Sequence, residues 1–327
     1  MKIRNIMKSP STITWKILRT IRGKINKLRS RFPKPSLINF PSENVNALIA
    51  ECITGDQPKM LTRFGSTELT ALLNYYDLNM IEEKWTAPVD YILGKTFGYK
   101  RWDPKSVRNM QVLSGFYPSN ESTLSRFSAE MFENVIPEID VLFSIWPNME
   151  WHIREHLQNK IICEYDILNF NAPDIWTAAL QGKKVLVIHP FEESIRHQYE
   201  KRELLFKNQN VLPRFTLLTL KAVQSVGDSK TEFADWFQAL DWMNSQIDLI
   251  DFDVALIAAG AYGMPLAAHV KKKGKTAIHV GGALQLLFGI KGARWDTTKD
   301  LYNEHWIRPL PCDVPAGAQK VESGCYW

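Results

Sequence analysis

Four apolar stretches of this sequence end in residues whose types suit the binding of an anion. The ends are Arg63-Phe64-Gly65-Ser66, His189-Pro190-Phe191, Gly260-Ala261-Tyr262-Gly263 and Gly281-Gly282. Glycine lets the backbone approach a bulky group and tolerates positive φ, and a helix that begins just after it offers unpaired N–H groups and a positive dipole end. A phosphate or a diphosphate fits such loops. For any single glycine a plain turn is the simpler interpretation, but four loops of this kind favour a site.

The absence of two known phosphate-binding motifs narrows the choice of ligand. The dinucleotide pattern G-x-G-x-x-G does not occur, because the segment GAYGMP at 260–265 has a different spacing. The chain also lacks the loop G-x-x-x-x-G-K-[ST]. Nicotinamide and P-loop chemistry are therefore disfavoured, and a nucleotide sugar remains the common ligand of such a crevice.

These loops need a particular fold to bring them together. In an open parallel sheet, ligands bind outside the carboxyl ends of the strands. Continuous apolar runs predict strands at 59–64, 183–190, 215–220, 252–259 and 275–282. Helical spacing predicts helices at 66–76, 192–206, 231–247 and 264–274. The alternation predicts an α/β fold with a Rossmann-like, mostly parallel sheet and helices on both faces. Residues 85–180 are rich in Trp, Tyr and Phe with short helical patterns, and no strand is predicted there.

The net charge of +5 is unevenly distributed along the chain. Residues 1–42 contain eleven of the 40 Lys and Arg residues and no acid, which leaves 29 basic and 35 acidic residues in 43–327. The basic character therefore belongs to an N-terminal segment. We predict that residues 1–42 form a basic amphipathic helix and a proline-containing linker, and that residues 43–327 form a single α/β domain.

The N-terminal segment has the pattern of a helix that binds a membrane surface. From residue 13 to 32 apolar residues recur at helical spacing, and basic residues fill the positions between them. Such a helix can lie among anionic headgroups, where each Lys or Arg contributes about 1 kcal/mol and Trp15 suits the interface. The alternative is a solvated basic arm, or an arm that contacts nucleic acid. We predict binding to an anionic membrane and no nucleic acid partner.

Other features predict a cytoplasmic location on the inner face of the cell membrane. The N-terminus lacks the uninterrupted apolar region and cleavage site of a signal peptide. The longest apolar stretch, 254–270, contains two glycines, a proline and a histidine, which favour a buried strand and helix over a membrane span. The four cysteines form no C-x-x-C pair and are expected to be reduced thiols.

The segment LTRFGSTEL at 61–69 resembles the strand-to-helix signature of bacterial GT-D-type glycosyltransferases, whose version ends Arg-Phe-Gly-Asp-Gly-Glu. A closer likeness is to a GT-D-like group of bacterial surface-polysaccharide clusters, and it is carried by KKVLVIHPFEESIRHQYEKRELLF, AAGAYGMPLAAHVKKKGKTAIHVGGALQLLFGIKGARW and VESGCYW. The longest of these is the most specific. The resemblance implies a Rossmann-like domain that transfers a sugar from a nucleotide diphosphate sugar to a glycan or lipid-linked acceptor, in capsule or O-antigen synthesis.

The resemblance also implies roles for the residues that match. Glu68 falls on the family's glutamate and Arg63 on its arginine, but Ser66 occupies the position of an aspartate that binds donor and metal. A serine hydroxyl is a weak, neutral ligand for Mg²⁺ or Mn²⁺, so metal dependence stays open. Arg63 would pair with donor phosphate, and Gly65 would permit its close approach. Ser66 would cap the helix or bond a phosphate oxygen, while Glu68 would hold a sugar hydroxyl or a metal, or act as base.

The remaining strand-end residues each have a structural alternative. His189 could contact phosphate or serve as a catalytic base, or it could be a buried, hydrogen-bonded imidazole. Tyr262 could stack on the nucleobase or simply pack in its turn. Lys291 and Arg294 could bind diphosphate or belong to a solvated basic turn. The candidate donor-binding set is Arg63, Gly65, Ser66, Gly260, Tyr262, Gly263, Gly281, Gly282, Gln285, Lys291 and Arg294, and the candidate catalytic residues are Glu68 and His189.

Two other functions remain open from the sequence. The H-x-x-E-H pattern of His152, Glu155 and His156 would place two imidazoles one helical turn apart with a glutamate as base, as in a zinc hydrolase. The serine in place of the aspartate favours a non-catalytic component that holds nucleotide sugar or glycan for a polysaccharide assembly complex. If the protein is a transferase, the aromatic-rich region 85–180 is the predicted acceptor site, because flat apolar faces suit sugar rings.

Overall fold

The computed structural model describes residues 12–29, 36–80, 87–97, 101–298 and 301–327. At its centre is a sheet of seven strands in the order β3-β2-β1-β7-β6-β4-β5, and every neighbouring pair is parallel. The strands are β1 (Met60–Thr62), β2 (Val141–Ser144), β3 (Ile161–Glu164), β4 (Lys184–His189), β5 (Thr216–Lys221), β6 (Val254–Ile257) and β7 (Thr276–His279). The predicted α/β fold with a Rossmann-like parallel sheet is confirmed.

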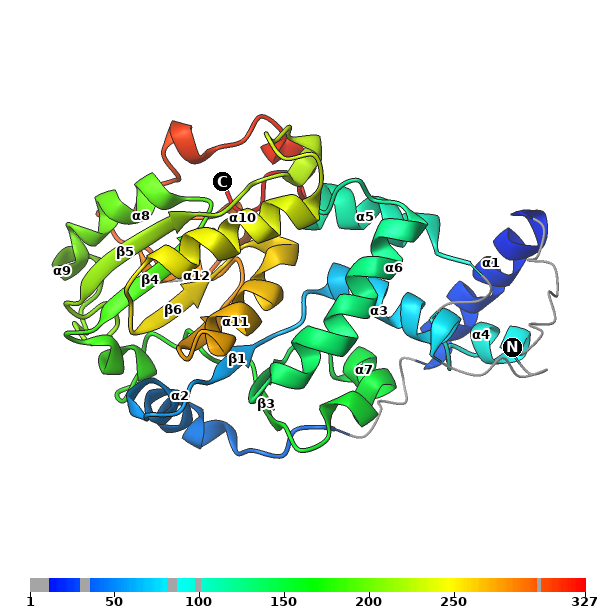
Figure 1. Cartoon of the computed structure of the whole chain (residues 1–327), viewed down its shortest axis with the longest axis horizontal. Coiled ribbons are helices and arrows are strands. Elements are labelled where there is room, and N and C mark those ends of the chain that lie inside the picture. The colour runs from blue at the N-terminus through cyan, green and yellow to red at the C-terminus, as the bar shows by residue number, and fades with distance from the viewer. Residues whose placement is uncertain (1–11, 30–35, 81–86, 98–100, 299–300) are drawn as a thin grey trace.

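Helices cover both faces of the sheet, as the continuous apolar strands require. In β4, Leu186 and Ile188 belong to one buried cluster, whereas Val185 and Val187 belong to the other. The first cluster includes residues of α3 (Ser66–Asn79), α5 (Pro104–Ser114), α6 (Glu121–Glu130), α10 (Trp236–Leu249) and α11 (Gly263–Lys272). The second includes residues of α2 (Val45–Thr54), α8 (Glu192–Tyr199), α9 (Arg202–Leu205) and α12 (Leu284–Leu287). Figure 1 shows α10 and α11 lying across the near face of the sheet.

Two strands and two helices differ from the sequence prediction. Strands β2 and β3 lie inside 85–180, where no strand was predicted. Their short apolar runs lie in an aromatic-rich segment that also fits helical spacing. The helix predicted at 231–247 begins five residues later, because the Asp235 side chain caps it by accepting a hydrogen bond from the Gln238 N–H at 2.8 Å. The helix predicted at 192–206 is divided into α8 and α9.

The N-terminal helix α1 (Thr12–Arg29) packs against α4 (Ala87–Ile92), at the right of Figure 1. The Arg22 guanidinium lies 4.4 Å from the centre of the Tyr91 ring and donates a hydrogen bond to the Phe97 carbonyl at 3.3 Å. The side chains of Ile17 and Ile21 on the same helix are exposed. The Trp15 side chain and residues 30–35, which were assigned to the membrane helix and the linker, lie outside the described structure. No helix within the described ranges is long and apolar enough to cross a membrane.

Candidate functional site

A cavity of about 450 Å³ lies at the carboxyl edge of the sheet. Residues that follow β1, β2, β4, β5, β6 and β7 line it, together with the ends of α5 and α6 and the C-terminal segment. Parallel strands deliver their carboxyl ends to one edge, so loops distant in sequence meet there. Of the predicted residues, those that line the cavity are Arg63, Gly65, Ser66, Glu68, His189, Gly260, Tyr262, Gly282, Gln285 and Arg294.

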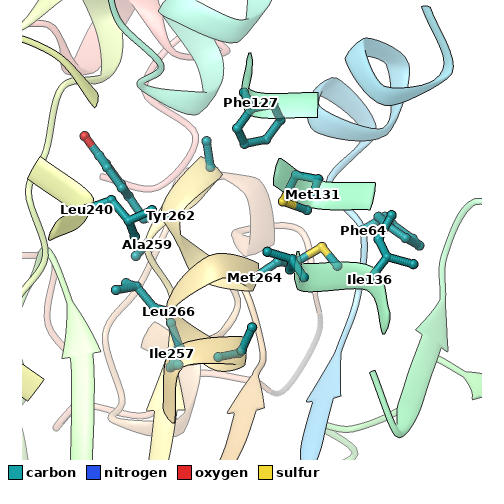
Figure 2. Close-up of a cluster of buried hydrophobic side chains, with 14 of the residues drawn as sticks. Phe64, Phe127, Met131, Ile136, Leu240, Ile257, Ala259, Tyr262, Met264 and Leu266 are labelled. Atoms are coloured by element: carbon teal, nitrogen blue, oxygen red, sulfur yellow. The ribbon is translucent and has the colours of Figure 1, made fainter. Parts of the chain in front are cut away.

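The apolar floor of this cavity belongs to the protein core. Phe127, Met131 and Met264 line the cavity and are also members of the first buried cluster. Figure 2 shows these three side chains gathered above Ile257 and Leu266. Because the floor is packed core, the polar groups around it are held by a rigid framework.

Arg63 supplies a positive charge at the cavity. It follows β1, is half-buried, and packs directly on Gly281, whose φ is +78°. A Cβ at Gly281 would overlap the guanidinium, so only glycine leaves room for Arg63 there. The guanidinium donates to the Phe64 carbonyl at 3.2 Å, and no carboxylate among the described residues pairs with it. Gly281 itself does not line the cavity, and it acts by placing Arg63.

Glu68 lies in the first turn of α3, folded back over Gly65. A Cβ at Gly65 would overlap the Glu68 carboxylate. Gly65 is the N-cap residue, with φ −77° and ψ 144°, and no side chain caps the helix. The prediction that Ser66 caps this helix was wrong, because Ser66 is already the first helical residue and its side chain is exposed. In the described part of the chain, the Glu68 carboxylate has no hydrogen-bond or ion-pair partner.

His189 ends β4 as a buried, neutral imidazole. Its Nδ1 accepts a hydrogen bond from the Phe191 N–H at 2.9 Å. Because a backbone N–H can only donate, Nδ1 carries no proton, and the proton of the neutral ring is on Nε2. Burial lowers the pKa of His189 to about 3. Near neutral pH this side chain therefore offers a ligand an Nε2–H donor, which favours contact with phosphate over the role of a base.

A second histidine, His279, was missed at the sequence level. It ends β7, is buried, and lines the cavity, and its Nδ1 lies 2.9 Å from the Thr62 hydroxyl. Burial, together with the positive charge of Arg63, lowers the pKa of His279 well below its ordinary value. A Cβ at Gly263 would overlap the imidazole, so Gly263 makes room for His279 and does not itself line the cavity. The available signal was a histidine two residues before Gly281, at the end of a predicted strand.

Tyr262 is part of the core. Its ring stacks on Trp236 with centroids 5.0 Å apart and an interplanar angle of 8°. The side chain is 1% exposed, so the packing interpretation describes it better than stacking on a nucleobase. The hydroxyl is near Ser225 and Tyr117 without hydrogen-bond geometry to either, and burial raises the pKa of Tyr262.

Gly260 forms a close contact at the same edge. Its φ is +52°, and a Cβ there would lie 2.9 Å from the carbonyl oxygen of Ser114, the last residue of α5. This glycine therefore lets the end of α5 approach the β6 loop closely. Ser114 and Gly260 both line the cavity, so the contact shapes its wall.

Residues 321–327, which we call the C-terminal strap, cover one side of the cavity. Arg294 pairs with Glu322 and donates to the Tyr326 hydroxyl at 3.2 Å. The Gln285 amide donates to the Tyr326 carbonyl at 3.0 Å, and also to those of Ile290 and Lys291. Gly282 lies against the ring of Tyr326, which a Cβ would overlap. Gln285 and Gly282 thus hold the strap in place.

The wall on the β5 side is closed by two glycines. Gly227, in the turn after β5, contacts Gly317 backbone to backbone, and a Cβ on either residue would overlap the other. Val226 and Val321, which flank this contact, line the cavity. The contact fixes the distance between the β5 loop and the chain that leads into the strap.

Lys291 is not brought to the cavity. Its ammonium lies 5.5 Å from the centre of the Tyr302 ring, and its backbone N–H bonds the Ile307 carbonyl at 2.7 Å. Lys291 is not among the residues that line the cavity, so the cavity gives no support to the prediction that it binds the donor.

The zinc pattern does not form a zinc site. Residues Trp151–Leu157 form a 3₁₀ helix that is interrupted at Ile153, so the regular α-helical turn that would put His152 and His156 on one face is absent. The His152 ring packs on Phe97 at 4.9 Å, and the His156 ring packs on Phe132 at 4.9 Å. Within the described residues, no group of three or more His, Cys, Asp or Glu side chains could hold a metal ion.

Comparisons of this chain with protein-family models, with curated proteins and with solved structures find no match. The chemistry of the cavity is therefore the basis for any assignment of function.

Proposed function

We propose that this protein transfers a sugar from a nucleotide diphosphate sugar to a glycan or lipid-linked acceptor. The observation that carries the proposal is Arg63: a half-buried guanidinium at the cavity that no described carboxylate neutralises. A buried charge is costly without a partner, so the site favours an anionic ligand. A diphosphate accepts the paired hydrogen bonds that a guanidinium offers.

The other cavity groups supply what the rest of such a donor needs. The N-terminus of α3 and the Nε2–H of His189 add donors for phosphate oxygens. The Tyr262 hydroxyl and the indole N–H of Trp327 are buried at the cavity without a hydrogen-bond partner in the described structure. Polar atoms of this kind call for a ligand or water. A volume of about 450 Å³ is in the range of small-molecule sites.

Glu68 is the residue we assign to the reacting sugar. In the proposed reaction the acceptor hydroxyl oxygen attacks the anomeric carbon, and the bond between this carbon and the diphosphate oxygen breaks. Glu68 takes the proton of the acceptor hydroxyl or binds a sugar hydroxyl. Arg63 and His189 stabilise the negative charge that develops on the leaving diphosphate.

A divalent cation fits this cavity in part. Mg²⁺ is commonly held by one or two carboxylates together with substrate phosphates. The carboxylates that line the cavity are Glu68 and Glu322, and Glu322 is paired with Arg294. Glu68 would hold Mg²⁺ or Mn²⁺ jointly with the diphosphate, and the cation would add positive charge there. The charge on Arg63 does not depend on it.

The test is binding to a panel of nucleoside diphosphates (UDP, GDP, dTDP, CDP) and their hexose conjugates, measured by thermal shift and calorimetry. We expect one nucleoside diphosphate and its hexose conjugate to stabilise the protein. Arg63→Met should weaken the binding of both at least tenfold, because a charge-assisted hydrogen bond contributes about 1.5–3 kcal/mol. Arg308→Met is the control, since Arg308 pairs with Asp296 outside the cavity. Equal losses in both variants, or no binding by any member, would refute the proposal.

A second candidate is a non-catalytic component that holds the nucleotide sugar. The exposed, neutral Ser66 at the position of the expected aspartate favours it. Donor binding without hydrolysis or transfer to any acceptor would support this role, and turnover would exclude it.

We also propose that α1 places the protein on an anionic membrane surface. The supporting observations are the excess of basic residues in 1–42 and the exposed side chains of Ile17 and Ile21, which are one helical turn apart. This location would bring the cavity near a lipid-linked acceptor on the cytoplasmic face of the cell membrane.

A further inference from the structure

Trp146 is a large exposed aromatic side chain at the cavity. It follows β2, in the loop before α7 (Pro147–Glu150), and its side chain is 38% exposed. It lines the same cavity as Arg63 and Glu68. An exposed indole at the wall of a cavity that also holds polar side chains presents a flat apolar face beside hydrogen-bonding groups.

A buried carboxylate holds the loop that carries Trp146. Glu150 is fully buried, and its Oε1 accepts the N–H groups of Ile145 at 3.3 Å and Trp146 at 3.1 Å. Its Oε2 accepts the Ser144 hydroxyl. Burial raises the pKa of Glu150, and these three donors compensate for the lost hydration. The backbone from Ser144 to the N–H of Trp146 is therefore held by this carboxylate.

The place of Trp146 in the strand order indicates which part of the proposed donor it would contact. Strand β2 neighbours β1, whereas His189 and Gln224 follow β4 and β5 at the opposite end of the strand order. Helix α7 packs against α3, which carries Glu68 in its first turn. Trp146 and Glu68 thus follow the neighbouring strands β2 and β1, and Arg63, which also follows β1, contacts Gly281 after β7.

We infer that Trp146 is the stacking surface for a hexopyranose ring, held beside Glu68 while the diphosphate lies on Arg63. The inference rests on the proposed function and names the part of the site that recognises sugar. The C–H face of a pyranose packs on the indole, and the hydroxyl groups at the ring edge reach the carboxylate. The ring belongs either to the donor or to the acceptor, since both present the same chemistry.

The test compares Trp146→Ala with Trp242→Ala. Trp242 is a matched control, because it is 37% exposed on α10 and does not line the cavity. Ligands are the nucleoside diphosphate that binds the parent protein best, its hexose conjugate, and a set of methyl hexopyranosides with maltotriose and cellotriose. If the ring belongs to the donor, Trp146→Ala weakens binding of the hexose conjugate about tenfold and binding of the nucleoside diphosphate less than twofold. For an acceptor sugar, it abolishes saturation-transfer NMR signals of the glycosides. Trp146→Phe restores either.

The outcomes separate this inference from the function on which it rests. If Trp146→Ala weakens nucleoside diphosphate and conjugate equally, the indole stacks on the base and the inference is overturned. If nucleotides bind but neither conjugate nor glycoside depends on Trp146, the inference fails and the donor proposal stands. If no nucleotide binds while glycosides bind through Trp146, the stacking surface stands and the donor proposal fails. If nothing binds to the parent protein, both fail.

The positioning role of Glu150 has its own readout. Glu150→Gln should weaken sugar binding in the parent protein and have no further effect in Trp146→Ala, because it acts through that side chain. Equal effects in both backgrounds would assign Glu150 to general stability.

Discussion

Arg63 and Gly281 show how one residue depends on another for its function. Gly281 combines a left-handed backbone conformation with direct contact to the guanidinium. Gly182 has a similar φ of +76° but nothing within 4 Å of a Cβ. Two consequences of glycine, backbone freedom and space for Arg63, can therefore be separated experimentally.

We expect Gly281→Ala and Gly182→Ala each to lose about 1 kcal/mol of stability from the left-handed conformation. Only Gly281→Ala should also displace Arg63 and weaken nucleoside diphosphate binding at least fivefold. Urea unfolding measures the first effect and calorimetry the second. Full affinity in Gly281→Ala would mean that Arg63 is not the diphosphate ligand.

Glu68 is tested by a substitution that keeps its shape. Glu68→Gln retains the contact over Gly65 but cannot accept a proton, so transfer should slow by about 10²–10⁴-fold if Glu68 is the base. In that role donor affinity should change less than twofold, whereas a larger loss of donor affinity would assign Glu68 to a donor hydroxyl or a cation. Transfer by Glu68→Gln at the parental rate would show that this carboxylate is not required for the reaction.

At the level of elements, the strands that were predicted are those with long apolar runs. β4 and β6 are buried on both faces and therefore read as continuous apolar sequence. β2 is buried along its length and β3 is an edge strand with partly exposed ends, and both lie among aromatic residues that also fit helices. The local pattern does not distinguish a strand from a helix here, because the pairing of β2 with β1 and of β3 with β2 decides it.

Helix α1 is the element proposed to meet the membrane. We expect the parent protein to sediment with anionic phosphatidylglycerol vesicles and to be released by about 0.5 M salt, since surface charges are screened there. Ile17→Asp with Ile21→Asp should reduce binding about tenfold, because two exposed apolar side chains leave the interface. Leu249→Asp, at an 80% exposed position on α10, is the control. Equal sedimentation of both variants would contradict the proposal.

On the scale of the whole molecule, the sequence predicted that loops meet at one edge, but not how each side chain points. Arg63, His189 and Gly260 do meet at the cavity, since parallel strands bring their ends together. Lys291 does not line the cavity, because its side chain lies beside the Tyr302 ring. The ring of Tyr262 is stacked on Trp236 in the core. Both arrangements depend on tertiary contacts that the sequence pattern does not reveal. The strap could not be predicted for the same reason.

Two buried neutral histidines make the stability of the whole molecule sensitive to acid. The pKa of His189 is about 3 in the folded state and about 6.5 when unfolded, and that of His279 is lowered in the same direction. Below pH 6.5 the unfolded chain binds protons that the folded chain does not, so folding stability falls as pH falls. The slope is about 1.4 kcal/mol per pH unit for each histidine.

We therefore expect urea unfolding to show decreasing stability from pH 6.5 to pH 5, and His189→Gln to reduce that slope by about half. The substitution removes one of the two titrating groups and can keep an acceptor for the Phe191 N–H. An unchanged slope in His189→Gln would show that His189 titrates in the folded protein as it does in the unfolded chain.

The contact between Gly227 and Gly317 restricts the route by which a ligand can enter the cavity. Side-chain rotation cannot widen the cavity at this contact, because the backbones of Gly227 and Gly317 already touch there. The exposed residues that line the cavity are Ser66, Trp146, Gly260, Arg294 and Glu322. In the proposed pose, with the sugar on Trp146, the donor would enter past Ser66 and Trp146. The sugar would then be the last part of the donor to pass inward, and the first to meet an acceptor arriving from outside.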